Sequence, residues 1–222
     1  MNRLPEFKDK TLLKQAFIHR SYLNETKEKL SSNERLEFLG DSILSFVVSK
    51  YLYDTFPDYD EGILTNIRSL VVNTKSLAKI AIEFKLGQFL MLSRGEEESN
   101  GRENESLLAN VVEAVIGALF IDQGIEAVKE FILSILAPKI DVIVSKKAFK
   151  DPKSLLQEFV QSQKQNSPIY KVLEEEGPPH AKIFTIGVLI QDEIMGQGVG
   201  KSKQEAEEAA AKEALKKLQK PF

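Results

Sequence analysis

The hydrophobic pattern divides the chain into two parts with different periodicities. Up to about residue 145, apolar positions recur every three or four residues, as along the buried face of a helix. Beyond that point the pattern alternates, so that Phe184, Ile186, Val188 and Ile190 fall on one face of a predicted strand. The first part predicts a mainly α domain and the second a small α+β domain. The helices expected in the first part span residues 10–21, 33–56, 62–84, 104–122 and 125–144.

A polar segment separates the two predicted domains. We expect domain 1 over residues 1–145, a linker over 146–151 and domain 2 over 152–222. Asp151 followed by Pro152 is a helix start, because an acidic cap and a proline at the first position both favour one. Domain 2 then reads α-β-β-β-α, with elements at residues 152–163, 169–175, 182–191, 193–198 and 203–218.

Three carboxylates lie on one face of the predicted helix 33–56. Glu34, Glu37 and Asp41 are spaced by three and four residues, which brings side chains together on a helix. Each pair at about 6 Å repels by roughly 3 kcal/mol at an effective dielectric near 20. Such a face is either solvated or neutralised by a cation. Gly40, on the same helix, predicts close approach by another element. The main core stripe is expected on the opposite side, at Leu36, Leu39, Ile43, Phe46 and Val47.

A second helix carries a carboxylate in apolar surroundings. Every position from 107 to 121 is apolar or small except Asn110 and Glu113, which predicts a buried helix. A buried glutamate is costly unless it is paired or bound to a metal. One interpretation is a salt bridge from a distant cation such as Arg35 or Arg68.

The other interpretation brings Glu113 together with Glu37 and Asp41 around a divalent cation. The chain has no cysteine and two histidines, His19 and His180, far apart in sequence. A metal site would therefore consist of oxygen ligands, which favour magnesium or manganese over zinc.

These motifs resemble the ribonuclease III family. The resemblance rests on residues 33–42, on the segments 19–22, 61–65 and 113–118, and on residues 151–218, which look like its double-stranded RNA-binding domain. It implies a magnesium-dependent endonuclease, with Mn²⁺ as a substitute, that cuts double-stranded RNA as a homodimer in rRNA and mRNA processing. Its products would carry 5′-phosphate and 3′-hydroxyl ends with short 3′ overhangs.

The resemblance also implies roles for particular residues of the first domain. The metal ligands would be Glu37, Asp41, Asn110 and Glu113, with Asp41 and Glu113 catalytic and Glu34 and Glu61 as supporting acids. For Glu61, an ordinary charge in a first helical turn is an equal alternative. Phe38 resembles the dimer-contact aromatic of the family, although its periodicity also permits ordinary packing.

Asn110 departs from the family pattern, which usually has Asp at this position. An amide keeps an oxygen donor but removes one negative charge, so metal affinity should fall. The residue is a tolerated variant, the mark of a cleavage-impaired RNA-binding homologue, or a deliberate substitution. We favour the first, because Glu113 and the other acids are all present.

Domain 2 offers a set of candidates for gripping duplex RNA. In the minor groove, amides and carboxylates can bond 2′-hydroxyls, and a helix N-terminus favours a phosphate. The candidates are Gln157, Glu158 and Gln161 on the first helix, His180 in the Gly-Pro-Pro turn, and Lys201 and Lys203 at the last helix. Residues 151–222 contain ten Lys, no Arg and eleven Asp plus Glu, so we expect modest affinity with a shallow salt dependence.

Several function classes are disfavoured by what the sequence lacks. No segment has the apolar length of a signal peptide or a membrane span, so we expect a cytoplasmic protein without a membrane partner. The segment 196–200 lacks the lysine and serine of a nucleotide-binding loop, so no nucleotide cofactor is expected. The rivals are a non-catalytic RNA-binding protein and another helical metal-dependent phosphohydrolase, which would need a His-Asp ligand pair.

Overall fold

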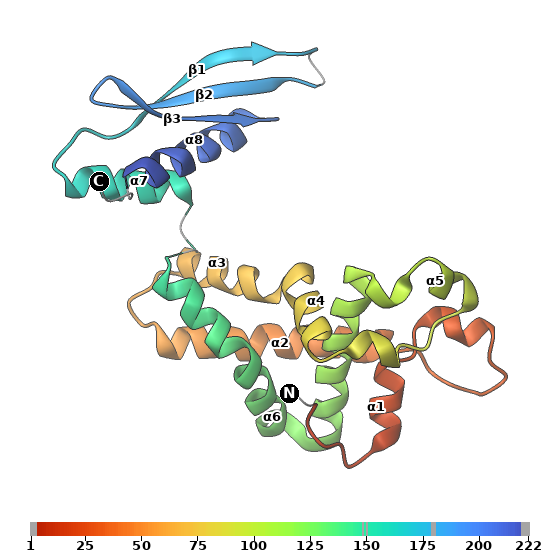
Figure 1. The fold of residues 1–222 in the computed structure, drawn as a ribbon. Coiled ribbons are helices and arrows are strands. Elements are labelled where there is room, and N and C mark those ends of the chain that lie inside the picture. Colours follow the sequence, from red (N-terminus) through yellow and green to blue (C-terminus); the bar gives the residue numbers. More distant parts are fainter. Residues whose placement is uncertain (1–3, 148, 150, 179–180, 219–222) are drawn as a thin grey trace. The chain divides into compact units, whose positions relative to one another are not determined.

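Two separate folding units make up the chain in the computed structural model (Figure 1), comprising residues 1–149 and 150–222. The structure describes residues 4–147, 149, 151–178 and 181–218. The first unit is helical, and the second combines two helices with a three-stranded sheet. This confirms the predicted fold class.

In the first unit two of the predicted helices differ from the pattern. The predicted helix 62–84 is two helices, because Asn73 ends the first and its side chain caps the second, accepting a bond of 3.0 Å from the Ser76 N–H. The predicted helix 10–21 ends at Ala16. The elements are α1 (Lys10–Ala16), η1 (Arg20–Asn24), α2 (Glu34–Thr55), α3 (Glu61–Val72), α4 (Thr74–Glu83), η2 (Leu86–Phe89), α5 (Arg94–Glu98), η3 (Gly101–Glu103) and α6 (Glu105–Ser145). Of these, the four short elements η1, η2, α5 and η3 were not predicted.

Helices α2 and α6 cross with their backbones in direct contact. A Cβ atom added at Gly40 would lie 1.8 Å from the carbonyl oxygen of Glu113, and one at Gly117 would lie 2.1 Å from that of Leu36. No side chain larger than hydrogen fits between the two helices at this point. The predicted close approach at Gly40 is therefore confirmed, and α6 is the element that makes it.

The core of the first unit surrounds this crossing. Leu44 and Val48 of α2 are buried together with Val111 and Val115 of α6. The predicted core stripe is right for Leu36, Ile43 and Val47, and Leu39 packs against the core while partly buried. It is wrong for Phe46, which is 60% exposed. Periodicity identified an apolar position here but not which surface it faces.

The second half of α6 changes direction at a glycine. Gly124 has φ 81° and ψ −172°, which breaks the helical path within the element. Because a positive φ is costly for other residues, glycine suits this kink. The sequence pattern placed a break between two helices at the same point.

Phe149, near the end of the first unit, is a buried aromatic residue. Phe149 falls within the predicted linker, yet it packs in the first unit with its ring 5.4 Å from that of Tyr59. Its carbonyl oxygen accepts a hydrogen bond from the side chain of Asn66. The first unit thus includes the chain up to this residue.

The second unit has the predicted α-β-β-β-α order. Its antiparallel sheet has strand order β1-β2-β3, and Ile186, Val188 and Ile190 are buried on the face that packs against the helices. The last helix begins with the predicted cap: Ser202 Oγ accepts the Glu205 N–H at 3.1 Å. The elements are α7 (Pro152–Ser162), β1 (Ile169–Glu176), β2 (Ile183–Ile190), β3 (Glu193–Gly200) and α8 (Lys203–Leu218). In the described part of the chain, no helix is both long and apolar enough to cross a membrane.

Candidate active site

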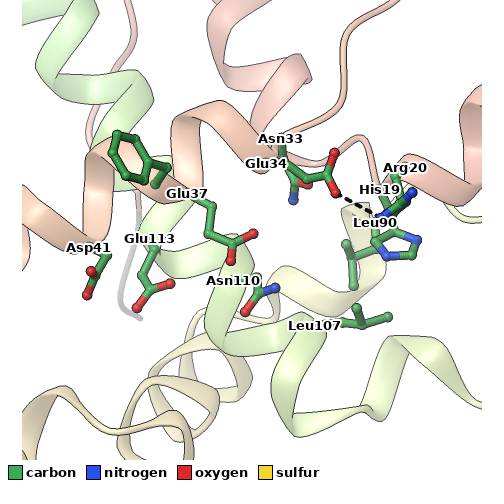
Figure 2. A pocket seen from close by; sticks show the side chains of 11 residues that line it. His19, Arg20, Asn33, Glu34, Glu37, Asp41, Leu90, Leu107, Asn110 and Glu113 are labelled. Carbon is green, nitrogen blue, oxygen red and sulfur yellow. Dashed lines mark ion pairs between the residues drawn. The ribbon is translucent and has the colours of Figure 1, made fainter.

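The crossing of α2 and α6 opens into a cavity of about 490 Å³ that we call the acidic cavity. Glu37 and Asp41 reach it from α2, and Asn110 and Glu113 reach it from α6, so that their polar ends face a common space (Figure 2). The backbone contact at Gly40 fixes how closely these two sets approach. The full lining comprises His19, Arg20, Asn33, Glu34, Glu37, Phe38, Asp41, Leu90, Leu107, Asn110 and Glu113.

The carboxylates of this cavity shift one another's protonation. Burial, together with the negative charges of Asp41 and Glu37, raises the pKa of Glu113 to about 7. Burial and the charges of Glu34 and Asp41 also raise the pKa of Glu37. Like charges that are partly removed from water disfavour ionisation, so the site resists carrying its full negative charge.

Glu113 has no cationic partner within the described residues. Neither Arg35 nor Arg68 forms an ion pair with it, and the Arg68 guanidinium instead donates to Ser49 Oγ at 2.9 Å. The salt-bridge alternative for Glu113 therefore finds no support here.

The side chains that face the acidic cavity are of the chemical type that binds a hard divalent cation. Three carboxylates and one amide supply only oxygen donors, which magnesium and manganese prefer. Yet no three acidic, histidine or cysteine side chains in the described ranges converge closely enough to hold one ion. The helices bring the donors to one cavity, whereas the side-chain rotamers leave the carboxylates apart.

Glu34 and Glu61, the two predicted supporting acids, differ in position. Glu34 lies at the edge of the acidic cavity, 3.4 Å from the Arg20 guanidinium. Its carboxylate also accepts a hydrogen bond of 3.0 Å from the Ser32 hydroxyl. Glu61 lines a different cavity, of about 850 Å³, and accepts a hydrogen bond from Thr65 at 3.1 Å. A single chain does not bring Glu61 to the other acids.

Three exposed aromatic side chains lie along α2. Phe38 is 77% exposed at the rim of the acidic cavity, Phe46 is 60% exposed, and Tyr53 is 71% exposed. Phe46 and Tyr53 also border the cavity that contains Glu61. We call Phe38, Phe46 and Tyr53 the aromatic row. Large apolar groups gathered on a surface are typical of an interaction site.

Sequence reasoning assigned no site role to three polar residues that line the acidic cavity. His19 and Arg20 are two of them, and in the sequence they stand out only as part of the motif at residues 19–22. Asn33 is 3% exposed and donates through Nδ2 to the Ala16 carbonyl at 3.2 Å. Asn33 precedes α2 at the capping position, but its side chain forms no capping hydrogen bond and instead joins the start of α2 to the end of α1.

The RNA-binding candidates of the second unit are spread over exposed positions. Gln157, Glu158 and Gln161 are exposed on α7. Lys203 begins α8 and holds its ammonium group 5.8 Å from the ring centre of Phe184. The remaining lysine, Lys201, is exposed, and its backbone N–H donates to Glu205 at 2.7 Å.

His180 lies outside the described residues. The structure therefore provides no observation on its predicted role in the turn before β2.

Family models match both units. Residues 9–140 match a model described as ribonuclease-III-like, and residues 152–218 match the double-stranded RNA binding motif. These ranges correspond to the helical unit and to the α-β-β-β-α unit.

Individual proteins agree with the family models. The chain is 47% identical over 213 residues to a protein named Ribonuclease 3 from Caldanaerobacter subterraneus subsp. tengcongensis, covering 96% of this chain and 93% of that protein. A solved nuclease domain of ribonuclease III from Campylobacter jejuni is 44% identical, with a TM-score of 0.55, and covers 59% of this chain and 88% of that one. Its description concerns flexibility in a region involved in dimer formation. Dicer from Pichia stipitis is 30% identical, with a TM-score of 0.51 and 97% coverage of both chains.

Proposed function

The chain belongs to the ribonuclease III family of double-strand-specific endoribonucleases, and we propose that its acidic cavity is the magnesium-dependent site of cleavage. The observation that carries this proposal is the partly buried charge of Glu113, which has no cationic partner in the described part of the chain and whose pKa is raised to about 7. A divalent cation would stabilise the ionised form of Glu113 against both causes of this pKa shift, its burial and the repulsion from Asp41 and Glu37. Family members in general use a divalent metal, and the oxygen donors in this cavity fit one.

In the proposed site, Glu37, Asp41, Asn110 and Glu113 would hold Mg²⁺, with Mn²⁺ as a substitute. Convergence on one ion requires rotation about side-chain bonds rather than movement of helices, since the crossing at Gly40 fixes the backbones. When bound, magnesium supplies charge stabilisation at the phosphate and lowers the pKa of a coordinated water.

The protein's own groups have separate tasks in this proposal. Asp41 and Glu113 would orient the cation next to the scissile phosphate, and Glu34 would support them from the cavity edge. The Asn110 amide contributes an oxygen without a charge, so metal binding is expected to be weaker than with aspartate. Hydrolysis would leave 5′-phosphate and 3′-hydroxyl ends.

The second unit would supply the grip on duplex RNA. Its family model is that of a double-stranded RNA binding motif, which supports a role for exposed polar groups on α7 and at the start of α8. We assign Gln157, Glu158, Gln161 and His180 to the minor groove and Lys201 and Lys203 to phosphates. Processing of rRNA and mRNA in the cytoplasm stays a prediction.

We also propose a homodimer formed through the aromatic row. Phe38, Phe46 and Tyr53 expose a large apolar area along one helix, and burial against a second copy would remove it from water. Glu61 borders the same surface, so its supporting role would be exercised at the dimer interface. The description of the Campylobacter jejuni nuclease domain mentions dimer formation, which supports a homodimer, whereas the exposure of the aromatic row is the reason for placing the interface there.

The function is tested by incubating the full chain with long duplex RNA and Mg²⁺ and reading product sizes and end chemistry on a gel. We expect metal-dependent cutting, with products that ligate as 5′-phosphates. Asn110→Asp should cut at lower Mg²⁺ concentration, because it restores a charge to the site. No cutting by the native chain at any Mg²⁺ or Mn²⁺ concentration, together with cutting by Asn110→Asp, would identify a cleavage-impaired homologue instead.

A further inference from the structure

One edge of the acidic cavity carries hydrogen-bond donors that the proposed metal site does not use. Among the described residues that line the cavity, Arg20 is the one lysine or arginine. His19 lies next to it at the same edge, and both lie apart from Asp41 and Glu113 (Figure 2). The proposed metal ion would neutralise part of the charge of the four carboxylates that line the cavity, and donors at its edge would receive the neighbouring phosphates of an RNA strand.

The hydrogen bonds around His19 determine which ring nitrogen carries the proton. Ser93 N–H donates to Ser21 Oγ at 3.0 Å, so that hydroxyl is free to donate its own hydrogen to His19 Nδ1, 2.8 Å away. The Ser21 N–H also points to Nδ1, at 3.3 Å. Because Nδ1 accepts, the neutral ring carries its hydrogen on Nε2.

The remaining ring nitrogen is available to a ligand. Nε2 forms no hydrogen bond within the described ranges, and the His19 side chain lines the cavity. The segment that carries it is fixed, since His19 N–H donates to the Met91 carbonyl at 3.1 Å and the ring caps η1. The cavity edge thus presents a positioned N–H donor.

Arg20 is held by an interaction that a phosphate can replace. Its guanidinium lies 3.4 Å from Glu34, and the two side chains are 73% and 52% exposed. Exposed ion pairs of this kind contribute little to stability, because water screens them. A guanidinium has five donors and binds phosphate oxygens in pairs, so exchange of Glu34 for a phosphate is favourable.

We propose that His19 and Arg20 form a phosphate-binding edge that holds a backbone phosphodiester adjacent to the one being cleaved. The inference rests on the proposed function, since it places the scissile phosphate beside Glu113. His19 would donate Nε2–H to a non-bridging oxygen, and Arg20 would leave Glu34 to bind the same group. This edge would set the position of the strand relative to the metal ligands.

The test measures duplex RNA binding and cleavage for matched variants of the full chain. Binding is measured in a Glu113→Gln background at fixed Mg²⁺, from about 50 to 200 mM KCl, where the slope of log affinity against log salt reports phosphate contacts. Arg20→Ala should lower affinity and kcat/KM about tenfold and reduce that slope by about one. Arg20→Lys should keep the slope while losing part of the affinity.

A second variant and a control separate binding from folding. His19→Asn keeps an acceptor for the Ser21 N–H but places no donor where Nε2 lies, so kcat/KM should fall about threefold with the salt slope unchanged. Lys14→Ala removes a cation from another exposed ion pair, 3.6 Å from Glu28, and should behave as the native chain. Melting temperatures should agree among all of these variants.

Two negative results have different meanings. If the native chain cuts duplex RNA and Arg20→Ala matches Lys14→Ala in affinity, slope and kcat/KM, the phosphate-binding edge is wrong and the proposed function stands. If the native chain neither binds nor cuts duplex RNA, the proposed function fails and this inference fails with it.

Discussion

Both units contain glycines that allow two elements to pack with their backbones in contact, but the consequences differ. In the first, Gly40 and Gly117 let α2 and α6 touch through their backbones, and in the second, Gly196 and Gly198 let β3 touch α8. A Cβ atom at Gly198 would lie 2.2 Å from the carbonyl oxygen of Ala206, which is as prohibitive as the first crossing. At the second crossing Glu213 of α8 accepts a hydrogen bond from the Gln197 N–H of β3 and pairs with Lys217 at 3.0 Å. The first crossing instead brings carboxylates together, and burial and the neighbouring negative charges raise the pKa of Glu113. Close packing by itself only holds two elements together. A candidate site arises where the packing also brings several unneutralised carboxylates into one cavity.

The largest effect is expected for a substitution in the acidic cavity. Glu113→Gln keeps the size of the side chain but removes the charge that lacks a cationic partner, so cleavage of duplex RNA should fall by about 10³-fold or more. Duplex binding through the second unit should stay within about threefold. The measurement is single-turnover cleavage beside a filter-binding assay. Near-native cleavage by this variant would remove the acidic cavity from the mechanism.

The packing itself can be tested with glycine substitutions in both units. Gly40→Ala should destabilise α2 and α6 by about 3 kcal/mol, because the added methyl overlaps a backbone carbonyl, and should also abolish cleavage. Gly198→Ala should cost a similar amount in β3 and α8 while leaving α2 and α6 unchanged. Hydrogen exchange, read peptide by peptide, distinguishes the two units.

Gly95 supplies the matched control for these substitutions. A Cβ atom at this position meets nothing within 4 Å, so Gly95→Ala should change neither exchange nor cleavage. Equal protection in Gly40→Ala and Gly95→Ala would show that the helices can separate without loss, contrary to the packing argument.

The acidic cavity should reduce stability as the pH rises. The pKa of Glu113 is about 7 in the folded chain against an ordinary value of 4.5, so the folded state binds its proton more tightly than the unfolded state. The stability associated with this proton is fully present below about pH 4.5 and is lost as the pH rises through about 7. Without divalent metal, Glu113→Gln should therefore gain about 1 kcal/mol at pH 8, allowing for solvent screening of a partly exposed group, and nothing at pH 4.5.

Denaturant unfolding at the two pH values measures this gain. Glu130→Gln, at an exposed position of the same helix, should leave stability within about 0.5 kcal/mol at both. A gain for Glu113→Gln that is equal at pH 4.5 and pH 8 would show that burial of its charge is not the cause.

The smallest effect is expected for a single RNA-binding candidate on the exposed surface of the second unit. Lys203→Ala should weaken duplex binding about threefold and reduce the salt slope by about one, because it removes one phosphate contact among several. Lys212, exposed on the same helix, is the control and should be neutral. Unchanged binding in Lys203→Ala would remove the start of α8 from the RNA surface.

The sequence predicted the second unit more completely than the first. Its element order followed from alternation at Ile186, Val188 and Ile190, because a sheet with one covered face shows its pattern locally. In the first unit, the helix break at Asn73 depends on a side-chain cap, which hydrophobic periodicity does not register. Phe46 was assigned to the core because periodicity does not distinguish a core face from an exposed one.

The site was predictable only in part. An apolar helix containing Glu113 required a partner for its charge, and Gly40 indicated where another helix would approach. The meeting of Glu113 with Glu37 and Asp41 was one of the two interpretations that the residues allowed.

The presence of His19 and Arg20 at the cavity edge depends on contacts between distant segments, which periodicity does not reveal. For Glu61, the family motif implied a site role, but within a single chain Glu61 lines a different cavity from the other acids.

The most direct test of the acidic cavity is the stabilisation of α2 and α6 by Mn²⁺ or Mg²⁺ at pH 8, measured by hydrogen exchange across a metal titration. A ligand that binds only the folded state stabilises it in proportion to the logarithm of its concentration above the dissociation constant. We predict saturable protection of α2 and α6 in the native chain, no protection of α8, and loss of the effect in Glu113→Gln. Equal protection in the native chain and in Glu113→Gln would contradict a metal site at the crossing of α2 and α6.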